Sequence, residues 1–267
     1  MPRASRYYIP GHVWHITHRC HKMEFLLKFA RDRQAWLDWL FEARRRFGIV
    51  VLNYAATSNH IHLLVYDHDG GEIIPESIQL SAGRIAREYN RRKRRKGAFR
   101  EDRYHATAIQ IDRHLVQCIV YMDLNMVGAG VAKHPSRWRH CGYREIQDAP
   151  EDYRLIERNP SIQLVGVGDS DQLSLCHRKW VEDALKIEES VRENRWSESI
   201  AVGDLSFVEK VKVELGGKAS GRKIVSGAES HELREHQVSY NDRFDLENAP
   251  LSPENRLYWN VYDETSI

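Results

Sequence analysis

The sequence predicts an α+β fold in which a ferredoxin-like antiparallel sheet carries helices on one face. Three observations predict it: apolar runs typical of strands, apolar residues at helical spacing, and the order of the two along the chain. Within the first 150 residues that order is β-α-β-β-α-β, followed by an extra helix. It is the order of the split βαβ arrangement.

The first four elements follow one another closely. Residues 12–19 are rich in β-branched and aromatic side chains and predict a strand. Residues 32–47 have apolar residues at helical spacing, and Gly48 ends the predicted helix. Residues 49–55 and 61–66 are apolar runs separated by a turn-prone Thr-Ser-Asn, which predicts two antiparallel strands.

The next three elements complete the core. Residues 75–96 predict a helix that starts near a proline and stops before a glycine. Residues 104–111 predict another strand. Asp112 can cap the helix that follows, and Gly128 or Gly130 can end it.

Beyond residue 150 the pattern is weaker. Residues 172–196 are predicted to be helical, and Ser206 and Glu209 have the spacing of a capping box for a short helix. Residues 216–227 have the composition of a linker. We therefore expect a mainly helical or irregular C-terminal extension.

The charge is distributed unevenly between two predicted domains, residues 1–150 and the extension 151–267. The first holds 25 Lys and Arg against 15 Asp and Glu, and the second holds 15 against 23. A basic first domain can bind a polyanion, whereas the acidic extension would be repelled by one or would fold back on the first domain. Drift in surface composition is the alternative explanation.

The composition is that of an ordinary globular protein, with 42% hydrophobic and 29% charged residues. No apolar run approaches the roughly 20 residues that span a bilayer, and the N-terminus lacks the apolar core of a signal peptide. The four cysteines form no CxxC pair, so neither a disulfide framework nor a zinc knuckle is indicated. We expect a cytoplasmic protein that does not bind membranes.

The candidate catalytic residues come from two fragments about sixty residues apart. On a strand His60 and His62 project to the same face, and on a helix Tyr121 lies beside Asn125. Two imidazoles and a carboxamide can hold a divalent metal ion, with the tyrosine as nucleophile, which suits cutting and rejoining a DNA strand. Imidazole favours Mn²⁺ and cellular abundance favours Mg²⁺, so either ion is expected.

Other residues offer weaker alternatives. Tyr89 is a rival nucleophile, but its neighbour one helical turn on is Lys93, which cannot bind a metal ion while protonated. Four histidines and a cysteine between residues 12 and 21 suggest a second metal site. Because their spacing of three alternates faces of a strand, we expect most of them to be structural or solvent-facing.

A basic run predicts where nucleic acid binds, because phosphates attract clustered arginines. It lies between the two parts of the candidate site, and Trp138 is either a base-stacking residue or part of the core. The candidate DNA-binding residues are Arg19, Arg84, Arg87, Arg91, Arg92, Arg94, Arg95, Arg103 and Trp138.

These motifs occur together in one family. Residues 7–145 resemble the REP-associated tyrosine transposases, relatives of the single-strand insertion-sequence transposases in the HUH nuclease superfamily. The matching stretches include Pro10-Gly11-x-x-x-His15-Ile16-Thr17-x-Arg19, Asn59-His60-Ile61-His62, Tyr89-Asn90-Arg91-Arg92, Asp102-Arg103-Tyr104 and Tyr121-x-x-Leu124-Asn125.

The resemblance implies a metal site at His60 and His62, with Asn125 as third ligand and Tyr121 as nucleophile. It also implies a substrate of single-stranded DNA folded into imperfect hairpins, and a monomer, although dimers occur elsewhere in the superfamily. The sequence departs from the family at Met126, where relatives commonly have proline. We expect the helix to continue there.

The sequence therefore predicts a metal-dependent, single-stranded DNA endonuclease and strand transferase that acts on hairpin DNA through a covalent 5′-phosphotyrosine intermediate. The alternative is a non-catalytic DNA-binding regulator that retains the fold. A zinc hydrolase is a weaker alternative because no Asp or Glu completes the usual ligand set. RNA binding through the ferredoxin-like sheet is a further alternative, although the expected aromatic signature is not evident in the sequence.

Overall fold

The computed structural model describes residues 9–68, 70, 72–101, 103–186, 194–227 and 230–234. Residues 1–235 form one compact unit, and a second unit, 236–267, lies outside the described residues. The described strands are β1 (His12–Arg19), β2 (Val50–Ala56), β3 (His60–Asp67), β4 (His105–Ile109), β5 (Ser199–Gly203), β6 (Lys223–Ser226) and β7 (His231–Arg234).

The described helices follow the same numbering along the chain. They are α1 (Ala30–Phe47), α2 (Ile73–Lys93), α3 (Arg113–Gly128), α4 (Tyr143–Gln147), α5 (Arg158–Val165), α6 (Ser170–Leu185), α7 (Arg195–Glu198) and α8 (Leu205–Leu215). Three short 3₁₀ helices, η1 (His21–Met23), η2 (Pro135–Arg137) and η3 (Gly216–Ala219), complete the list. No helix in the described ranges has the length and apolar character needed to cross a membrane.

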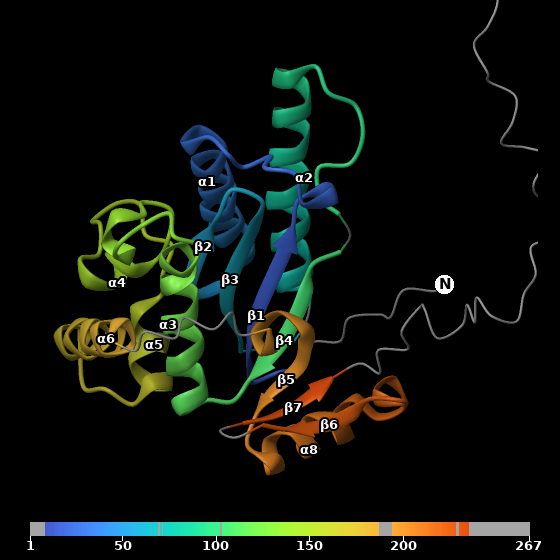
Figure 1. The fold of residues 1–267 in the computed structure, drawn as a ribbon, viewed down its shortest axis with the longest axis vertical. Helices are drawn as coiled ribbons and strands as arrows, with labels where there is room; N and C mark the ends of the chain where they lie inside the picture. Colours follow the sequence, from blue (N-terminus) through green and yellow to red (C-terminus); the bar gives the residue numbers. More distant parts are fainter. Residues whose placement is uncertain are drawn as a thin grey trace, which may run out of the picture. The chain divides into compact units, whose positions relative to one another are not determined.

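The seven strands form one sheet in the order β2-β3-β1-β4-β5-β7-β6 (Figure 1). The four strands from β2 to β4 pair in antiparallel fashion, as the sequence predicts. The extension continues the sheet: β5 pairs with β4 in parallel, and β7 and β6 follow in antiparallel pairing. The α+β, ferredoxin-like prediction is confirmed, and the extension adds three strands that were not predicted.

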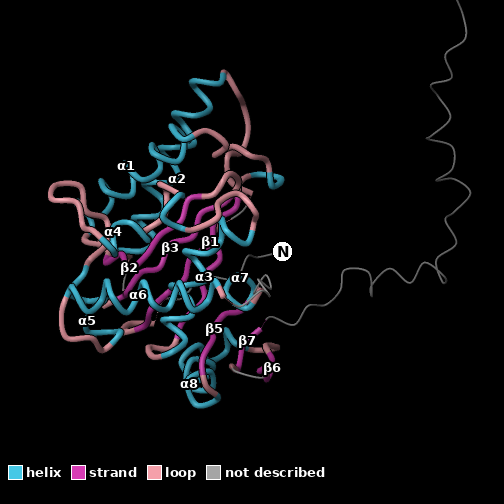
Figure 2. The backbone as a smooth tube through the Cα atoms, turned by 60° about the vertical axis from the view of Figure 1, so that its left-hand side comes forward, coloured by secondary structure: helices cyan, strands magenta, loops and turns pink. Residues whose placement is uncertain are grey.

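Helices cover both faces of the sheet, so the prediction that they lie on one face only was wrong: α3 and α7 pack on the second face. In the view of Figure 2 the strands run between α1 and α2 on one side and α3 and α7 on the other. Because side chains alternate along a strand, His15 and His62 face α3 while Ile16 and Ile61 face the opposite side. Every one of these four side chains is at most 1% exposed, so each face has its own buried layer.

The core elements match their predicted bounds closely. The strand at residues 12–19 is reproduced to the residue, and Gly48 ends α1 in the left-handed conformation with φ 73°. Helix α2 ends at Lys93, three residues earlier than predicted, because Arg94 takes a left-handed conformation with φ 49°. Asp112 caps α3 as predicted, its carboxylate accepting the amide hydrogen of His114 at 2.8 Å.

The extension departs from the prediction in three places. The predicted helix 172–196 is two helices, α6 and α7, with residues 187–193 outside the described part. The cap of α8 is Asp204 rather than Ser206, since the Asp204 carboxylate accepts the amide hydrogen of Phe207 at 2.8 Å. The predicted linker 216–227 contains strand β6, which becomes a strand by pairing with β7.

A buried contact between a carboxylate and an imidazole attaches the extension to α3. Asp123 on α3 and His177 on α6 meet at 2.6 Å, and each side chain is at most 1% exposed. The amide of Asn53 on β2 donates to the other carboxylate oxygen of Asp123 at 3.2 Å, and Gln147 contacts the other ring nitrogen of His177 at 2.7 Å. The carboxylate is thus satisfied only when α6 is docked.

Replacing His177 by Phe is expected to destabilise the protein strongly. The ring volume is retained, but the Asp123 carboxylate loses its main partner inside the core, which costs about 3–5 kcal/mol. Chemical denaturation would measure the loss. Lys186→Gln removes an exposed pair with Asp183 at the end of the same helix and is expected to leave the denaturation midpoint unchanged. Equal denaturation midpoints for both variants would contradict the stabilising role of the contact between Asp123 and His177.

Candidate active site

The two histidines of the predicted metal site lie at the start of β3. His60 pairs with Arg19 and His62 pairs with Thr17 of β1, so neighbouring strands hold the two backbones in register. Their ring centroids are 4.7 Å apart at an interplanar angle of 82°. His62 is 1% exposed, whereas His60 is partly exposed, so the pair runs from the core to the surface.

Helix α3 brings the other two predicted residues to this pair. The ring of Tyr121 meets the ring of His62 edge to face, with centroids 5.7 Å apart. The side-chain nitrogen of Asn125 lies 3.1 Å from Nε2 of His62. The helix continues past Met126 to Gly128, as expected, and Asn125 still reaches the histidine. All four residues predicted from two distant fragments therefore lie in one cluster.

Two further residues belong to the cluster and were missed from the sequence. His15 on β1 contacts Nδ1 of His62 through its own Nε2 at 2.9 Å. Trp196 on α7 accepts a hydrogen bond from Nδ1 of His15 at its carbonyl oxygen, 2.7 Å away, and its ring lies 6.2 Å from that of Tyr121. Side chains two residues apart on a strand share a face, so the position of His15 two residues before Thr17 could have identified it. Trp196 had no such signal, because long-range folding brings it here.

The His12, His15, His18 and His21 series is mostly structural, as expected, but not solvent-facing. His12, His15 and His18 are buried. The ring of His18 meets that of Tyr104 at 6.0 Å, and His18 lies three residues after His15 on β1, so the two side chains face opposite sides of the sheet. The member that matters for the site is His15 alone.

Hydrogen bonds orient His60 toward metal binding. Its Nδ1 lies 2.7 Å from the side-chain oxygen of Asn59, whose amide nitrogen is directed to the carbonyl of Met23 at 3.4 Å. An amide oxygen only accepts, so Nδ1 of His60 carries the hydrogen and Nε2 carries the lone pair. A neutral imidazole with a lone pair on Nε2 is a usual metal ligand.

The donor set fits a divalent metal ion only if an amide oxygen takes part. Among the described residues, no group of three or more His, Cys, Asp and Glu side chains can hold a metal ion. His60 and His62 supply two nitrogen donors, and Asn125 lies against the second of them. Imidazole and amide oxygen are ligands that Mn²⁺ and Mg²⁺ accept. The roles of these residues stay predictions.

The rival nucleophile lies elsewhere. Tyr89 is on α2, where its ring packs against Phe99 with centroids 5.0 Å apart and lies under the guanidinium of Arg92 at 5.2 Å. Burial raises the pKa of the Tyr89 hydroxyl, which makes it harder to ionise. Tyr121, and not Tyr89, is the tyrosine whose ring meets that of His62.

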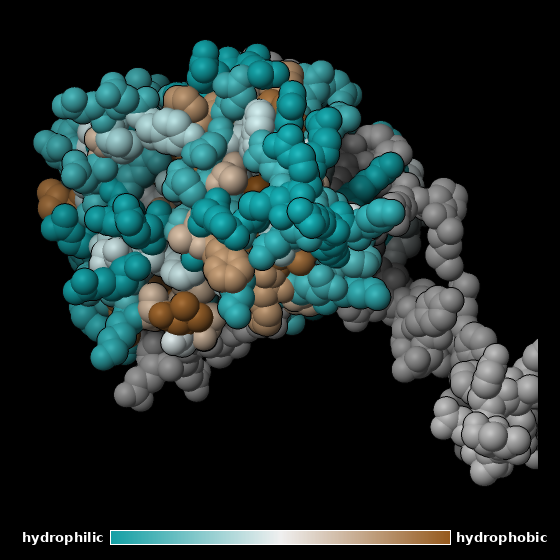
Figure 3. Space-filling model, turned by 90° about the horizontal axis from the view of Figure 1, so that it is seen from above, coloured by the Kyte–Doolittle hydropathy of each residue, from teal (hydrophilic) through white to brown (hydrophobic). Residues whose placement is uncertain are grey.

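The predicted DNA-binding arginines fall into two groups. Arg84 stacks over Trp39 at 5.0 Å, and Arg92 forms an ion pair with the buried Asp32, so both also hold α2 against α1. Arg91 and Arg94 are exposed at the C-terminal end of α2. Figure 3, which looks onto that end of the molecule, shows a surface that is largely hydrophilic.

The other predicted members of this surface differ in their contacts. Arg87 is exposed and bonds the carbonyl of Gly83 at 3.2 Å, and Arg95 bonds the carbonyl of Ala98 at 2.7 Å. Arg103 is exposed. Arg87 lies on α2 itself, whereas Arg95 and Arg103 lie in the loop that follows α2.

The chain that follows α2 returns to the His60 end of the sheet. The amide of Glu101 donates to the carbonyl of Arg19 at 3.2 Å, and Arg19 is the residue paired with His60. Arg100 donates to the carbonyl of His18 at 2.9 Å. Residues 100 and 101, at the end of the basic run, therefore lie beside the strand end that carries His60.

Trp138 has a structural position. Its indole nitrogen donates to the carbonyl of Ala56 at 3.0 Å, and the guanidinium of Arg33 lies 4.6 Å from its ring centroid. In contrast, Phe25 and Phe29, which the sequence did not single out, are 64% and 49% exposed. They lie in the loop that contacts the turn before His60, where the amide of Leu27 donates to the carbonyl of Ser58 at 2.9 Å.

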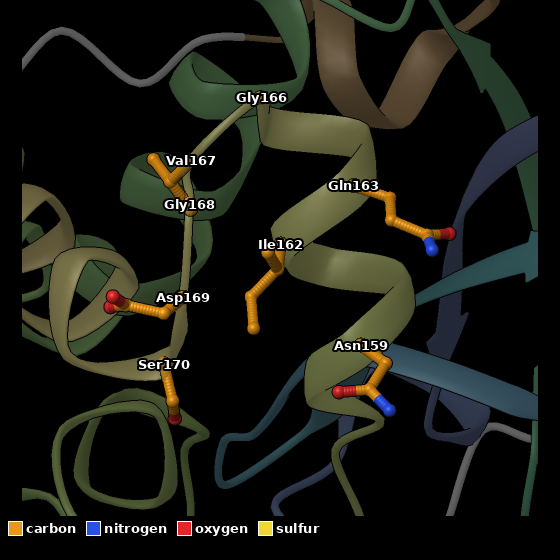
Figure 4. Close-up of a pocket in the computed structure, with 8 residues that line it drawn as sticks. All are labelled: Asn159, Ile162, Gln163, Gly166, Val167, Gly168, Asp169 and Ser170. Carbon is orange, nitrogen blue, oxygen red and sulfur yellow. The ribbon is translucent and has the colours of Figure 1, made fainter.

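A hollow lies beside α5 (Figure 4). It shares no residue with the cluster and includes a single titratable side chain, that of Asp169. Its lining residues are Asn159, Ile162, Gln163, Gly166, Val167, Gly168, Asp169 and Ser170.

Two solved structures are similar to this chain. One is a REP-associated tyrosine transposase bound to a REP hairpin; it is 18% identical with a TM-score of 0.44, and the match covers 64% of this chain and 93% of that one. The other is described as a "putative transposase" from Deinococcus radiodurans R1; it is 16% identical with a TM-score of 0.30, and the match covers 38% and 82%. The first belongs to the family that the motifs resemble. No protein-family model and no curated protein matches the sequence.

Burial of His15 predicts how stability depends on pH. Desolvation lowers the pKa of His15 from 6.5 to about 4, so between these values the unfolded chain binds a proton that the folded protein does not. The stabilisation is complete above pH 6.5 and is lost as the pH falls toward 4. It amounts to roughly 3 kcal/mol in all.

His15→Gln is therefore expected to flatten this dependence by about one proton, or about 1.4 kcal/mol per pH unit at most. Urea denaturation at several values between pH 7 and pH 4 would measure it. His140, whose pKa is also lowered to about 4, keeps its contribution in both proteins. Parallel curves for the two proteins would contradict the burial of a neutral His15.

Proposed function

We propose that this protein is a metal-dependent, single-stranded DNA endonuclease and strand transferase that acts on hairpin DNA through a covalent 5′-phosphotyrosine intermediate. The observation that supports it best is the cluster of His60, His62, Tyr121 and Asn125. Two metal-binding histidines beside a tyrosine nucleophile are the combination that this chemistry needs.

Each side chain has a distinct task in this proposal. His60 and His62 direct Nε2 toward the ion, and Asn125 supplies its amide oxygen once the amide has turned. The metal ion, when bound, neutralises the phosphate oxygens. The Tyr121 oxygen attacks phosphorus and releases its proton to water. The bond from phosphorus to the 3′ oxygen breaks, and that oxygen takes up a proton and leaves as a hydroxyl.

The phosphotyrosine link is what permits strand transfer. It holds the 5′ phosphate on the protein in an ester of similar energy to the bond that was cut. Attack by another 3′ hydroxyl on this ester would reform a phosphodiester and release Tyr121. No external energy source is then needed for rejoining.

The basic segment after α2 supports DNA as the partner. Arg91 and Arg94 are exposed there, and the following loop reaches the strand end at Arg19 and His60. Phosphates of a strand entering the site would meet these cations. The exposed rings of Phe25 and Phe29 lie in the loop at the same strand end and can stack on unpaired bases.

Several finer points of the proposal come mainly from the sequence. The hairpin form of the DNA comes from the family resemblance, and so does the expectation of a monomer. Mg²⁺ or Mn²⁺ is proposed from the donor set together with that resemblance. The cytoplasmic location stays a prediction from the sequence.

Tyr121→Phe is expected to abolish the covalent adduct with DNA, because the phenol oxygen is the proposed nucleophile. Labelled single-stranded hairpin oligonucleotides would be incubated with the protein and Mg²⁺ or Mn²⁺ and separated on a denaturing gel. Tyr89→Phe is the matched control, since Tyr89 is the rival tyrosine on α2 and is expected to leave the adduct unchanged. An adduct that survives Tyr121→Phe would refute this nucleophile.

A native gel of the same reactions, read beside the denaturing gel, separates the two functional classes. Hairpins that are retarded on a native gel without any covalent band, across several divalent metals, would identify a DNA-binding protein without nuclease chemistry. That result would keep the DNA partner and reject the enzyme.

Removing two exposed charges is expected to weaken DNA binding in a salt-dependent way. Arg91→Gln with Arg94→Asn, the second chosen because Asn tolerates the left-handed backbone of Arg94, would lose two phosphate contacts. The slope of log affinity against log salt should fall by about 1.4 for a single strand. Fluorescence anisotropy at several salt concentrations measures this slope. Arg45→Gln on α1 is the control, and an unchanged slope in the double variant would contradict this binding surface.

A further inference from the structure

A chain of hydrogen bonds leads from the C-terminal extension to the candidate metal site. It starts at the carbonyl oxygen of Trp196, which lies 2.7 Å from Nδ1 of His15. It continues from Nε2 of His15 to Nδ1 of His62, 2.9 Å away. It ends at Nε2 of His62, which faces the side-chain nitrogen of Asn125 at 3.1 Å.

The direction of this chain is determined at its first link. A backbone carbonyl oxygen can only accept a hydrogen bond, so Nδ1 of His15 must carry a hydrogen. His15 is fully buried, and its ring nitrogens meet a backbone carbonyl and a second imidazole rather than a carboxylate. Because a buried charge without an anionic partner is strongly disfavoured, the ring is neutral. A neutral imidazole has one hydrogen, which leaves Nε2 of His15 as an acceptor.

The second link then follows from the first. Because Nε2 of His15 accepts, Nδ1 of His62 must donate, and the single hydrogen of a neutral His62 lies on Nδ1. The lone pair of His62 is consequently on Nε2, the atom that faces Asn125. Asn125 could not impose this choice by itself, because an amide can turn to present either its nitrogen or its oxygen.

The first acceptor is held firmly by the extension. The indole of Trp196 is 0% exposed and packs beside Tyr121, and the guanidinium of Arg195 lies 4.7 Å from its centroid. The hydroxyl of Thr107 on β4 lies 3.2 Å from the same carbonyl and 2.6 Å from that of Ser199. Parallel pairing of β5 with β4 then anchors residues 194–199, which lead into β5, to the sheet.

We propose that residues 194–199 of the extension set the tautomer of His62, acting through the Trp196 carbonyl and His15, so that Nε2 of His62 is the nitrogen presented to a divalent cation. His15 is on this proposal a positioning residue, because it acts on the metal through His62. The value of this tautomer to the enzyme rests on the proposed function. The hydrogen-bond geometry that sets the tautomer is independent of that function.

The test reads the tautomer directly in the full-length protein without metal or DNA. Long-range proton–nitrogen NMR correlations of protein labelled with ¹⁵N-histidine distinguish a protonated ring nitrogen from one with a lone pair. The expected result near pH 7 is hydrogen on Nδ1 of both His15 and His62. A hydrogen on Nε2 of His62 in the unsubstituted protein would overturn the proposal, and this measurement needs no variant to fold.

Three variants separate the hydrogen-bond chain from simple packing. His15→Phe keeps a ring but removes both nitrogens, so the Nε2-protonated form of His62 should appear and Mn²⁺ affinity should fall 10- to 100-fold by calorimetry. Trp196→Phe keeps the carbonyl and changes the ring beside Tyr121, and Thr107→Val removes the other group on that carbonyl. Both should leave the His62 tautomer unchanged.

The outcomes keep the two proposals apart. A folded His15→Phe protein with an unchanged His62 tautomer and unchanged Mn²⁺ affinity would overturn the positioning role, even if the Tyr121 adduct forms. The expected tautomer in a protein that never forms the adduct would uphold the hydrogen-bond chain and reject the nuclease.

Discussion

The pairing of β1 between β3 and β4 is the constraint on which the site depends. It sets Thr17 opposite His62 and His15 opposite both Leu64 and Thr107. A slip of one residue would turn His15 from the α3 face to the other, because side chains alternate along a strand. Hydrogen bonding on both edges of β1 excludes that slip, so the two imidazoles meet with little freedom. This register fixes the 2.9 Å contact between Nε2 of His15 on β1 and Nδ1 of His62 on β3.

Helix α3 is held at the sheet by polar contacts made along its length. On one side Asp123 is bonded to Asn53 of β2 and to His177 of α6. On another side Tyr121 and Asn125 meet His62. Residues two apart on a helix point in different directions, so the same turn can be anchored in the core and still present the nucleophile. A rigid helix of this kind limits how far the tyrosine can move from the phosphate that it is proposed to attack.

What sequence reasoning recovers depends on whether the signal is local. The strand at residues 12–19, the cap at Asp112 and the facing of His60 with His62 all come from patterns within a few residues, and the structure has them. Strand β6 has four residues that are largely exposed, so no alternation marks it. It forms through pairing with β7, which is a tertiary event. Trp196 was unpredictable for the same reason.

The place of Trp196 changes how the two predicted domains relate. The boundary near residue 150 marks a change in sequence pattern and charge, whereas the compact unit extends to residue 235. Without the extension, β4 would lose its parallel partner, and the buried His15 would lose the acceptor of its Nδ1 hydrogen. An unsatisfied buried donor costs about 1–3 kcal/mol, and it also leaves the ring free to choose its tautomer. The acidic extension therefore contributes to the basic domain's site through the carbonyl oxygen and the packed indole of Trp196.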